Sequence, residues 1–231
     1  MKVIDLSQEI YTGMPVFSGH MKTVVFDSMT HEECVRLMED GYSYRTNGLL
    51  LCDHGPTHID AVSHIDPDPK APTIDTMPLS TFFGKGICLD LSEYPDHTLF
   101  EPKHIKAAEK KAVRPIEKDD IVLFYTGHFD RHYPKYEYVS VYSGFSLESA
   151  VYLIEEKGIK NWGADTPSPD RPPTKTYPVH QHYKKTRVPH MENLCNLNKL
   201  LKDEFMFFGF PLKIRKGSGS PIRAVAIIGL K

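Results

Sequence analysis

The sequence predicts a mixed α/β domain built on a partly antiparallel sheet. Three observations support this class: short apolar runs rich in β-branched and aromatic residues recur along the chain, few segments have helical spacing, and loops rich in glycine and proline separate them. With 231 residues, 40% of them hydrophobic, the chain can bury one sizeable core. We therefore expect a single domain over residues 1–231.

Six apolar runs are predicted to be strands, because β-branched and aromatic side chains suit a pleated surface: 24–26, 49–52, 87–91, 121–125, 205–210 and 224–228. A helix is expected from Leu147 to Ile154, with Ser146 placed to cap its start and Gly158 just past its end. Further helices are expected over 102–112, 194–201 and 31–40. The five-proline stretch 163–183 should not hold regular structure for long, and it is typical of a loop that builds a site.

The composition excludes several classes of partner. The formal net charge of −2 provides no basic surface for a nucleic acid or an anionic membrane. Asp5 and Glu9 stand where a signal peptide would need an apolar run, and no stretch approaches the length of a membrane span. We therefore expect a cytoplasmic protein that binds a small molecule.

The cysteines are predicted to be free thiols. Cys34, Cys52, Cys88 and Cys195 are scattered without CxxC spacing. Cys52 lies two residues before a histidine and is a candidate metal ligand or nucleophile, but it continues the apolar run LLLC. We interpret it as a core residue.

Residues 54–64, HGPTHIDAVSH, are the most informative segment for function. His54, His58, Asp60 and His64 all occupy even positions, so an extended chain directs the four side chains to one face. A helix would separate the first two from Asp60, and Pro56 would remove a helical hydrogen-bond donor, which argues against an HExxH helix. Imidazole and carboxylate groups in this pattern indicate a site for Zn²⁺ or Mn²⁺.

Strand geometry suggests a role for each side chain. His58 and Asp60 are two residues apart, about 6.6 Å along a strand, and can share an ion. The Gly-Pro turn after His54 can return that histidine to the same ion, while His64 lies furthest along and is left free for proton transfer. Serine chemistry is not expected, because Ser63 should point away and the chain has no GxSxG elbow.

Further ligand candidates lie in the C-terminal half. Glu192 occurs in HMENLCNL and His180 lies twelve residues upstream; either is suited to complete a metal shell. The residues alone leave the choice open, because His182 and His190 compete with His180. The glycine-rich segment 216–228 is compatible with an anion site, but we favour a structural connection.

Five separated blocks resemble the cyclase-like metal-dependent hydrolases, which include bacterial kynurenine formamidase and isatin hydrolase. They are IDLSQEIYTGMPVFSGH, HGPTHIDAVSH (similar to the family's HxGTHxDxPxH), YSGFSLESAVYLIEEKGIKNWGADTPSPD, the His180 to Glu192 pair with ENLCNL, and PLKIRKGSGSPIRAVAI. The resemblance covers nearly the whole chain. It implies a mixed α/β fold of the swivelling β/β/α type, assembled as homodimers or homotetramers with a partner near the site.

The resemblance also implies roles for individual residues. It places His54, His58 and Asp60 on a first metal ion, has Asp60 bridge to a second, and completes the pair with His180 and Glu192; His64 matches the catalytic histidine and Phe17 an aromatic that contacts substrate. The chain departs from the family pattern at HGPTH, at DAVSH, at His20, where Asp is common, and at Phe17, where formamidases often have Trp. These departures bear on the substrate more than on the reaction class.

The sequence therefore predicts a metal-dependent amidohydrolase that uses one or two Zn or Mn ions to cleave a small aryl formamide or a cyclic amide. An isatin-type or lactone ring hydrolase is the alternative within enzymes. A metal-binding homologue without turnover is a second alternative. An iron redox enzyme on a His, His, Asp triad fits the ligand types, but the His180 to Glu192 pair argues against it.

Overall fold

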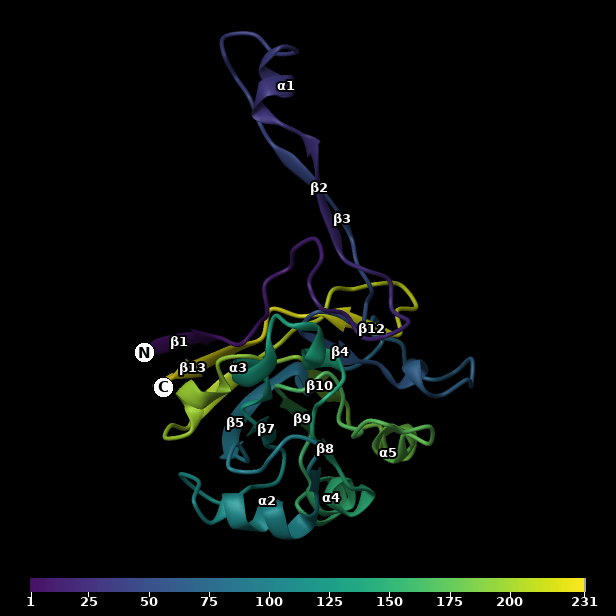
Figure 1. Ribbon diagram of the computed structural model, residues 1–231, viewed down its shortest axis with the longest axis vertical. Coiled ribbons are helices and arrows are strands. Elements are labelled where there is room, and N and C mark those ends of the chain that lie inside the picture. The colour runs from purple at the N-terminus through teal and green to yellow at the C-terminus, as the bar shows by residue number, and fades with distance from the viewer. Residues whose placement is uncertain (231) are drawn as a thin grey trace.

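A curled sheet of nine strands forms the centre of the structure, a computed structural model that describes residues 1–230 (Figure 1). Its spatial order is β1-β13-β11-β5-β7-β9-β10-β4-β12. In chain order the strands are β1 (Lys2–Asp5), β4 (His58–Asp60), β5 (Phe83–Asp90), β7 (Ile121–Tyr125), β9 (Asn161–Ala164), β10 (His190–Glu192), β11 (Phe205–Phe208), β12 (Gly219–Pro221) and β13 (Val225–Ile228). The neighbours β5, β7, β9 and β10 run parallel, and the other pairs are antiparallel.

The central strand β7 is buried on both faces, as expected for the middle of a parallel sheet. Ile121 and Leu123 pack into one apolar cluster, which also includes Phe207. Val122 and Phe124 face the opposite way, into a second cluster around Trp162. The alternation of side chains along one strand thus links the two halves of the core.

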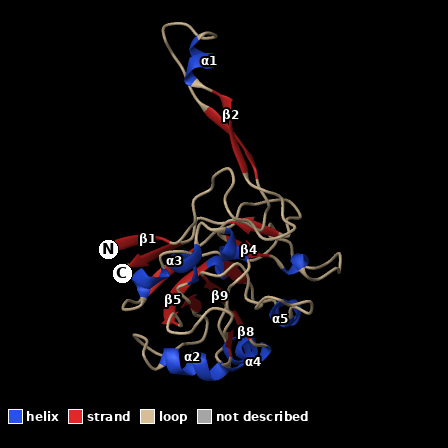
Figure 2. Cartoon of the chain, viewed as in Figure 1, coloured by secondary structure: helices blue, strands red, loops and turns tan. Residues whose placement is uncertain are grey.

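The helices are short and lie around the sheet: α2 (Pro102–Glu109), α3 (His128–His132), α4 (Leu147–Val151) and α5 (Pro178–Thr186). Figure 2 shows α2 and α4 together on one side of the sheet, where their apolar residues join the cluster around Trp162. Ser146 caps α4 through a 3.2 Å hydrogen bond from the Ser149 amide, and a wider π-type turn continues the helix over Tyr152–Glu156. Single 3₁₀ turns cover Val62–His64, Leu79–Phe82, Tyr136–Val139 and Leu197–Leu200, and β6 (Leu99–Phe100) pairs with β8 (Gly144–Phe145).

A long arm extends from the body (Figure 1). It consists of β2 (Val24–Met29) paired antiparallel with β3 (Thr46–Leu50), and it carries α1 (His31–Val35) between the strands. Gly48 lies opposite Phe26, and a Cβ on Gly48 would come within 2.2 Å of the Phe26 ring, so the missing side chain lets the ring lie across the ribbon. Phe26, Leu37 and Leu49 are 53%, 70% and 58% exposed. The arm therefore presents apolar side chains to water.

Each of the six apolar runs overlaps a strand. The run 121–125 coincides with β7, while β3 begins at Thr46, before the predicted run, and ends at Leu50. The helices expected at 147–154, 102–112 and 31–40 are also present, the last only over His31–Val35. The four cysteines are free thiols, as predicted. Within residues 1–230 no helix is long and apolar enough to cross a membrane.

One expected helix is largely absent. The helix predicted over 194–201 is only the 3₁₀ turn Leu197–Leu200, because the amides of Leu194 and Cys195 bond to the carbonyls of Ala164 and Leu6, and Asn196 has a left-handed backbone with φ of 58°. The stretch 163–183 holds regular structure only at its ends, as predicted: β9 ends at Ala164, residues 165–177 are irregular, and α5 begins at Pro178. Pro178 occupies the first helical turn, where proline is tolerated because its missing N–H needs no partner there.

Candidate metal centre

The pairing of β4 with β10 creates the base of the candidate site. Glu192 lies opposite His58 and Met191 opposite Ile59 in the antiparallel register. Because side chains alternate along a strand, Ile59 and Met191 enter the apolar core, whereas His58, Asp60 and Glu192 face the other way. The Nε2 atom of His58 lies 3.5 Å from Asp60 Oδ1 and 3.4 Å from Glu192 Oε2.

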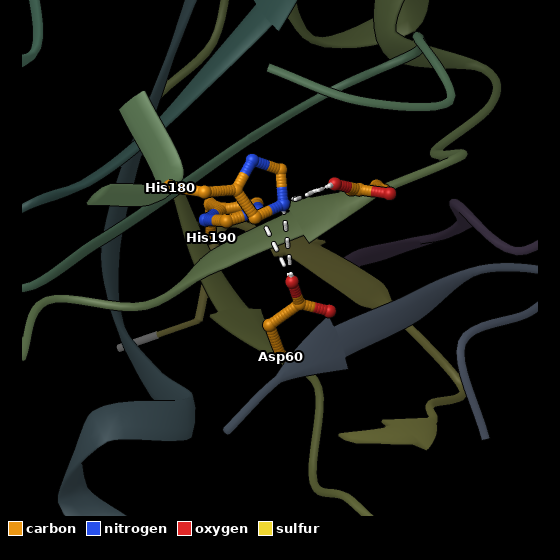
Figure 3. A group of neighbouring side chains, drawn as sticks. Asp60, His180 and His190 are labelled. Carbon is orange, nitrogen blue, oxygen red and sulfur yellow. Dashed lines mark hydrogen bonds and ion pairs between the residues drawn. The ribbon is translucent and has the colours of Figure 1, made fainter. Parts of the chain in front are cut away.

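Asp60 is at the centre of the cluster and is only 1% exposed. Its Oδ1 atom lies 2.8 Å from His54 Nδ1, and its Oδ2 atom lies 3.3 Å from His190 Nε2, 3.6 Å from His180 Nε2 and 3.9 Å from His64 Nε2. Figure 3 shows His180 and His190 directed at this carboxylate. Oδ2 is buried and makes no hydrogen bond of acceptable geometry to any residue in the described range. A carboxylate oxygen buried among imidazoles without a hydrogen bond is suited to bind a divalent cation.

His54 is held by residues from the far end of the chain. Its Nε2 atom lies 2.9 Å from Ser218 Oγ, and the Ser218 hydroxyl donates to Asp53 Oδ2 at 2.7 Å. A Cβ on Gly219 would come within 2.7 Å of the His54 ring, so this position in β12 leaves space for the imidazole. The glycine-rich segment thus packs against the His54 imidazole.

Asp170 positions His180. The carboxylate accepts hydrogen bonds from the backbone amides of Val179 (2.9 Å) and His180 (3.1 Å), and so caps the first turn of α5. Its Oδ2 atom also lies 2.5 Å from His180 Nδ1. A hydrogen bond at Nδ1 fixes the imidazole so that Nε2 faces Asp60, as is usual for a histidine that binds a metal.

The structure separates the three histidines that competed as ligands. His180 and His190 both reach the cluster, and with Asp60 and Glu192 they offer ligand atoms within 4.8 Å of one another. His182 is two residues along α5 from His180 and points to the other side, where its Nε2 atom lies 3.3 Å from Glu155 Oε1. His190 therefore lies in the cluster beside His180, whereas His182 does not.

Electrostatics favour ionised carboxylates in the cluster. Burial opposes ionisation of Glu192, yet hydrogen bonds from His190 and His58 lower its pKa to about 2. Burial also opposes ionisation of Asp60, but the surrounding imidazoles, with His54 foremost, hold its pKa well below its usual value. For His180, burial disfavours the cation, but Asp170 and Asp60 raise its pKa to about 10. Protons on the imidazoles thus balance the negative charge of the Asp60 and Glu192 carboxylates. A bound divalent cation would displace these protons and balance the same charge.

His64 lies beside the cluster, although the chain is not extended throughout residues 54–64. Only His58–Asp60 is a strand; the 3₁₀ turn Val62–His64 follows and brings the His64 ring to 4.0 Å from that of His54. The prediction that one extended face carries all four side chains is wrong, but the four do converge. The His64 side chain is 31% exposed, and burial lowers its pKa to about 4 against the attraction of Asp60. It is therefore neutral at pH 7 and able to accept a proton.

A cavity of about 340 Å³ opens above the cluster. Phe17, Ile65, Pro167 and Tyr177 form apolar parts of its wall, and His20 lies 5.4 Å from the Phe17 ring. Phe17 thus lines the cavity, where the sequence resemblance placed a substrate contact.

Other nucleophiles that the sequence offers are not suited to the chemistry. The Ser63 hydroxyl donates to the Gly217 carbonyl at 3.4 Å. Burial raises the pKa of Cys52, so its thiol stays protonated at neutral pH.

All of the residues predicted from the sequence line or form this site: His54, His58, Asp60, His64, His180, Glu192 and Phe17. Sequence reasoning assigned no role to Asp170, Ser218 or Tyr177. Asp170 is the last residue of the segment GADTPSPD. An acidic residue in a proline-rich stretch gave no sign that it would cap α5.

A second group, Asp96, His128 and His132, lies outside the cavity. Arg131 already pairs with Asp96 at 2.8 Å, and His128 Nε2 lies 2.7 Å from the Tyr138 carbonyl. These contacts fasten α3 to its surroundings.

Comparison with known proteins agrees with this geometry. The Cyclase family model, described as "Putative cyclase", matches residues 4–171. Kynurenine formamidase of Bacillus anthracis is 25% identical over 224 residues, which are 97% of this chain and 96% of that protein.

Solved structures match the fold over nearly the whole chain. Isatin hydrolase A from Labrenzia aggregata, bound to benzyl benzoate, has a TM-score of 0.86 at 22% identity and covers 99% of this chain and 94% of its own. A protein described as a potential metal-dependent hydrolase with cyclase activity has a TM-score of 0.75 at 22% identity, with 97% and 96% covered. The mixed α/β fold predicted from the sequence is thereby confirmed, and the chain belongs to the cyclase family.

Proposed function

We propose that this protein is a metal-dependent hydrolase that cleaves a small aryl formamide or a cyclic amide. The observation that carries the proposal is Asp60, a buried and ionised carboxylate surrounded by imidazoles and Glu192 at the base of a cavity of about 340 Å³. We assign His54, His58, Asp60, His180 and Glu192 to hold one or two divalent ions, Zn or Mn.

A divalent ion bound there would supply a water molecule of lowered pKa and polarise a carbonyl oxygen. The other roles belong to the protein. Asp170 and Ser218 hold the imidazoles of His180 and His54 in place. His64, neutral at pH 7 and beside His54, is placed to accept a proton and to return it to the leaving nitrogen.

The cavity wall supports an aromatic substrate without a strong charge. Phe17 and Tyr177 provide aromatic faces against which a planar ring can pack. Within residues 1–230, neither lysine nor arginine lines the cavity, so a substrate carboxylate would meet no ammonium or guanidinium group from this chain. The names of the relatives, a formamidase and isatin hydrolases, fit a linear or a cyclic aryl amide. A ring hydrolase acting on an isatin or a lactone is the second candidate.

Metal removal combined with a His64→Ala variant tests the proposal. Chelation should abolish turnover of aryl formamide or isatin substrates, and Zn²⁺ or Mn²⁺ should restore it. His64→Ala should keep its metal but lose about 10² to 10⁴ in kcat, or about 2.7 to 5.5 kcal/mol. Ser63→Ala is the matched control, because Ser63 adjoins His64 but bonds to a backbone carbonyl. Turnover that persists after verified metal removal would refute the proposal, and absence of turnover on every amide and lactone tested would favour the metal-binding homologue.

We also propose that the protein assembles as a homodimer or homotetramer in the cytoplasm. The exposed apolar residues of the arm, Phe26, Leu37 and Leu49, support assembly because a second copy would remove them from water. Four free cysteines agree with a reducing compartment.

A further inference from the structure

We propose that His190 is an additional metal ligand, which gives an inner ion four ligands from the protein: Asp60, His180, His190 and Glu192. This inference builds on the proposed metal dependence. It distinguishes two unequal positions, an inner one between β4, β10 and α5, and an outer one at His54 and His58.

The position of the His190 Nε2 atom carries the inference. It lies 3.2 Å from Glu192 Oε1 and 3.3 Å from Asp60 Oδ2, between the two carboxylates. The His180 ring meets the His190 ring edge to face, with centroids 4.7 Å apart, and His180 Nε2 lies 3.7 Å from the same Glu192 oxygen. Two imidazole nitrogens and two carboxylates thus face one small volume, as Figure 3 shows for Asp60 and both histidines. This donor set suits Zn²⁺ or Mn²⁺.

The other side of the ring indicates that Nε2 is the functional end of His190. His190 pairs with Trp162 across the parallel strands and is buried against the rings of Trp162 and Tyr183. Its Nδ1 atom is buried and has no hydrogen-bond partner anywhere in the part of the chain described. An unpaired polar atom in the core costs about 1 to 3 kcal/mol, so an apolar residue would pack here at lower cost unless Nε2 binds something.

The two positions should differ in function. A site with four protein ligands is characteristic of a structural ion, whereas a catalytic ion keeps a position open for substrate. All four inner residues are at least nine-tenths buried. His54 and His58 are as deeply buried, but the outer position lies beside the partly exposed His64, whose ring is 4.0 Å from that of His54, whereas His190 in the inner set does not line the cavity. We therefore expect the inner ion to exchange slowly and the outer ion to exchange readily.

The alternative is that the His190 imidazolium itself fills the place of a second cation. Metal content distinguishes these possibilities without reference to turnover. The purified protein would be stripped, titrated with Zn²⁺, and its bound metal measured by mass spectrometry for wild type, His190→Ala and His190→Gln. His182→Ala is the matched control, since His182 is also buried near α5 but faces Glu155.

We expect wild type and His182→Ala to bind one additional Zn²⁺ per chain tightly. In the two His190 variants the zinc affinity of the inner position should fall by more than about 10²-fold. Equal zinc stoichiometry and affinity in wild type and in either folded His190 variant would overturn the inference. If His190→Ala does not fold, His190→Gln, which keeps a polar side chain, provides the test. Turnover with an unchanged ion count would overturn the role of His190 and leave the hydrolase proposal standing. Loss of one ion in the His190 variants, in a protein that hydrolyses none of the substrates, would support the role of His190 and refute the hydrolase proposal.

Discussion

Replacing Asp170 with Asn should weaken zinc binding without unfolding the protein. The Asp170 carboxylate is 1% exposed and makes three contacts, to the amides of Val179 and His180 and to His180 Nδ1 at 2.5 Å. Asparagine keeps the shape but replaces one oxygen by an NH₂ group. Only one atom of the new side chain can accept a hydrogen bond, so either the helix cap or the imidazole contact is lost.

The size of the effect follows from the contacts. Loss of a capping contact costs about 0.5 to 2 kcal/mol of stability. Loss of the carboxylate that orients a metal-binding histidine typically weakens metal affinity by about 10 to 100-fold, or about 1.4 to 2.7 kcal/mol. We expect zinc affinity to fall within that range in Asp170→Asn.

The assay is competition for Zn²⁺ with a chromophoric chelator, accompanied by urea unfolding of the metal-free protein. Asp66→Asn is the control, because that carboxylate lies near α5 but pairs with Lys184, at 3.3 Å, outside the cavity. Zinc affinity equal to wild type in a folded Asp170→Asn variant would refute the argument that Asp170 holds His180 for metal.

Two further predictions concern pH and assembly. Burial raises the pKa of Asp165 from its ordinary value of 3.8 to about 6, against hydrogen bonds from Thr126. Between these two pH values the native state therefore keeps a proton that the unfolded chain releases. The free energy of unfolding should therefore fall by about 1.3 kcal/mol from about pH 5 to about pH 7 through this group, and urea titrations of Asp165→Asn should lack that component; an identical pH dependence in the variant would contradict the assignment. For assembly, a Phe26→Ser, Leu49→Ser double variant should reduce the mass measured by light scattering, whereas Leu79→Ser, 65% exposed on the body, should not. A wild-type mass of one chain would contradict assembly.

The sequence was most informative where one strand carries the chemistry. The two-residue spacing of His58 and Asp60 placed both on one face because β4 is extended there. The same spacing holds for His190 and Glu192 in β10, but it could not be interpreted without knowing that β10 pairs with β4. The choice between His180 and His190 was thus a question of tertiary structure, which brings both into the cluster.

Other features depend on contacts that no local pattern carries. The strands of the arm have ordinary β-rich composition, and their pairing only with each other is a matter of topology. The start of α5 lies in a proline-rich stretch, and it is stabilised by Asp170, eight residues before Pro178. Local propensity therefore gave no sign of the helix that begins at Pro178, because its capping carboxylate lies eight residues upstream.

The placement of Ser218 and Gly219 against His54 determines when the site can form during synthesis. The two hydrogen-bonded residues, His54 and Ser218, are 164 positions apart, and β4 lies in the sheet between β10 and β12, both of which are made later. A growing chain thus exposes the proposed ligands of HGPTHIDAVSH on the ribosome long before the strands that orient them exist. Metal held by that nascent segment has no defined geometry, so the native centre can be completed only after the last strands have joined the sheet.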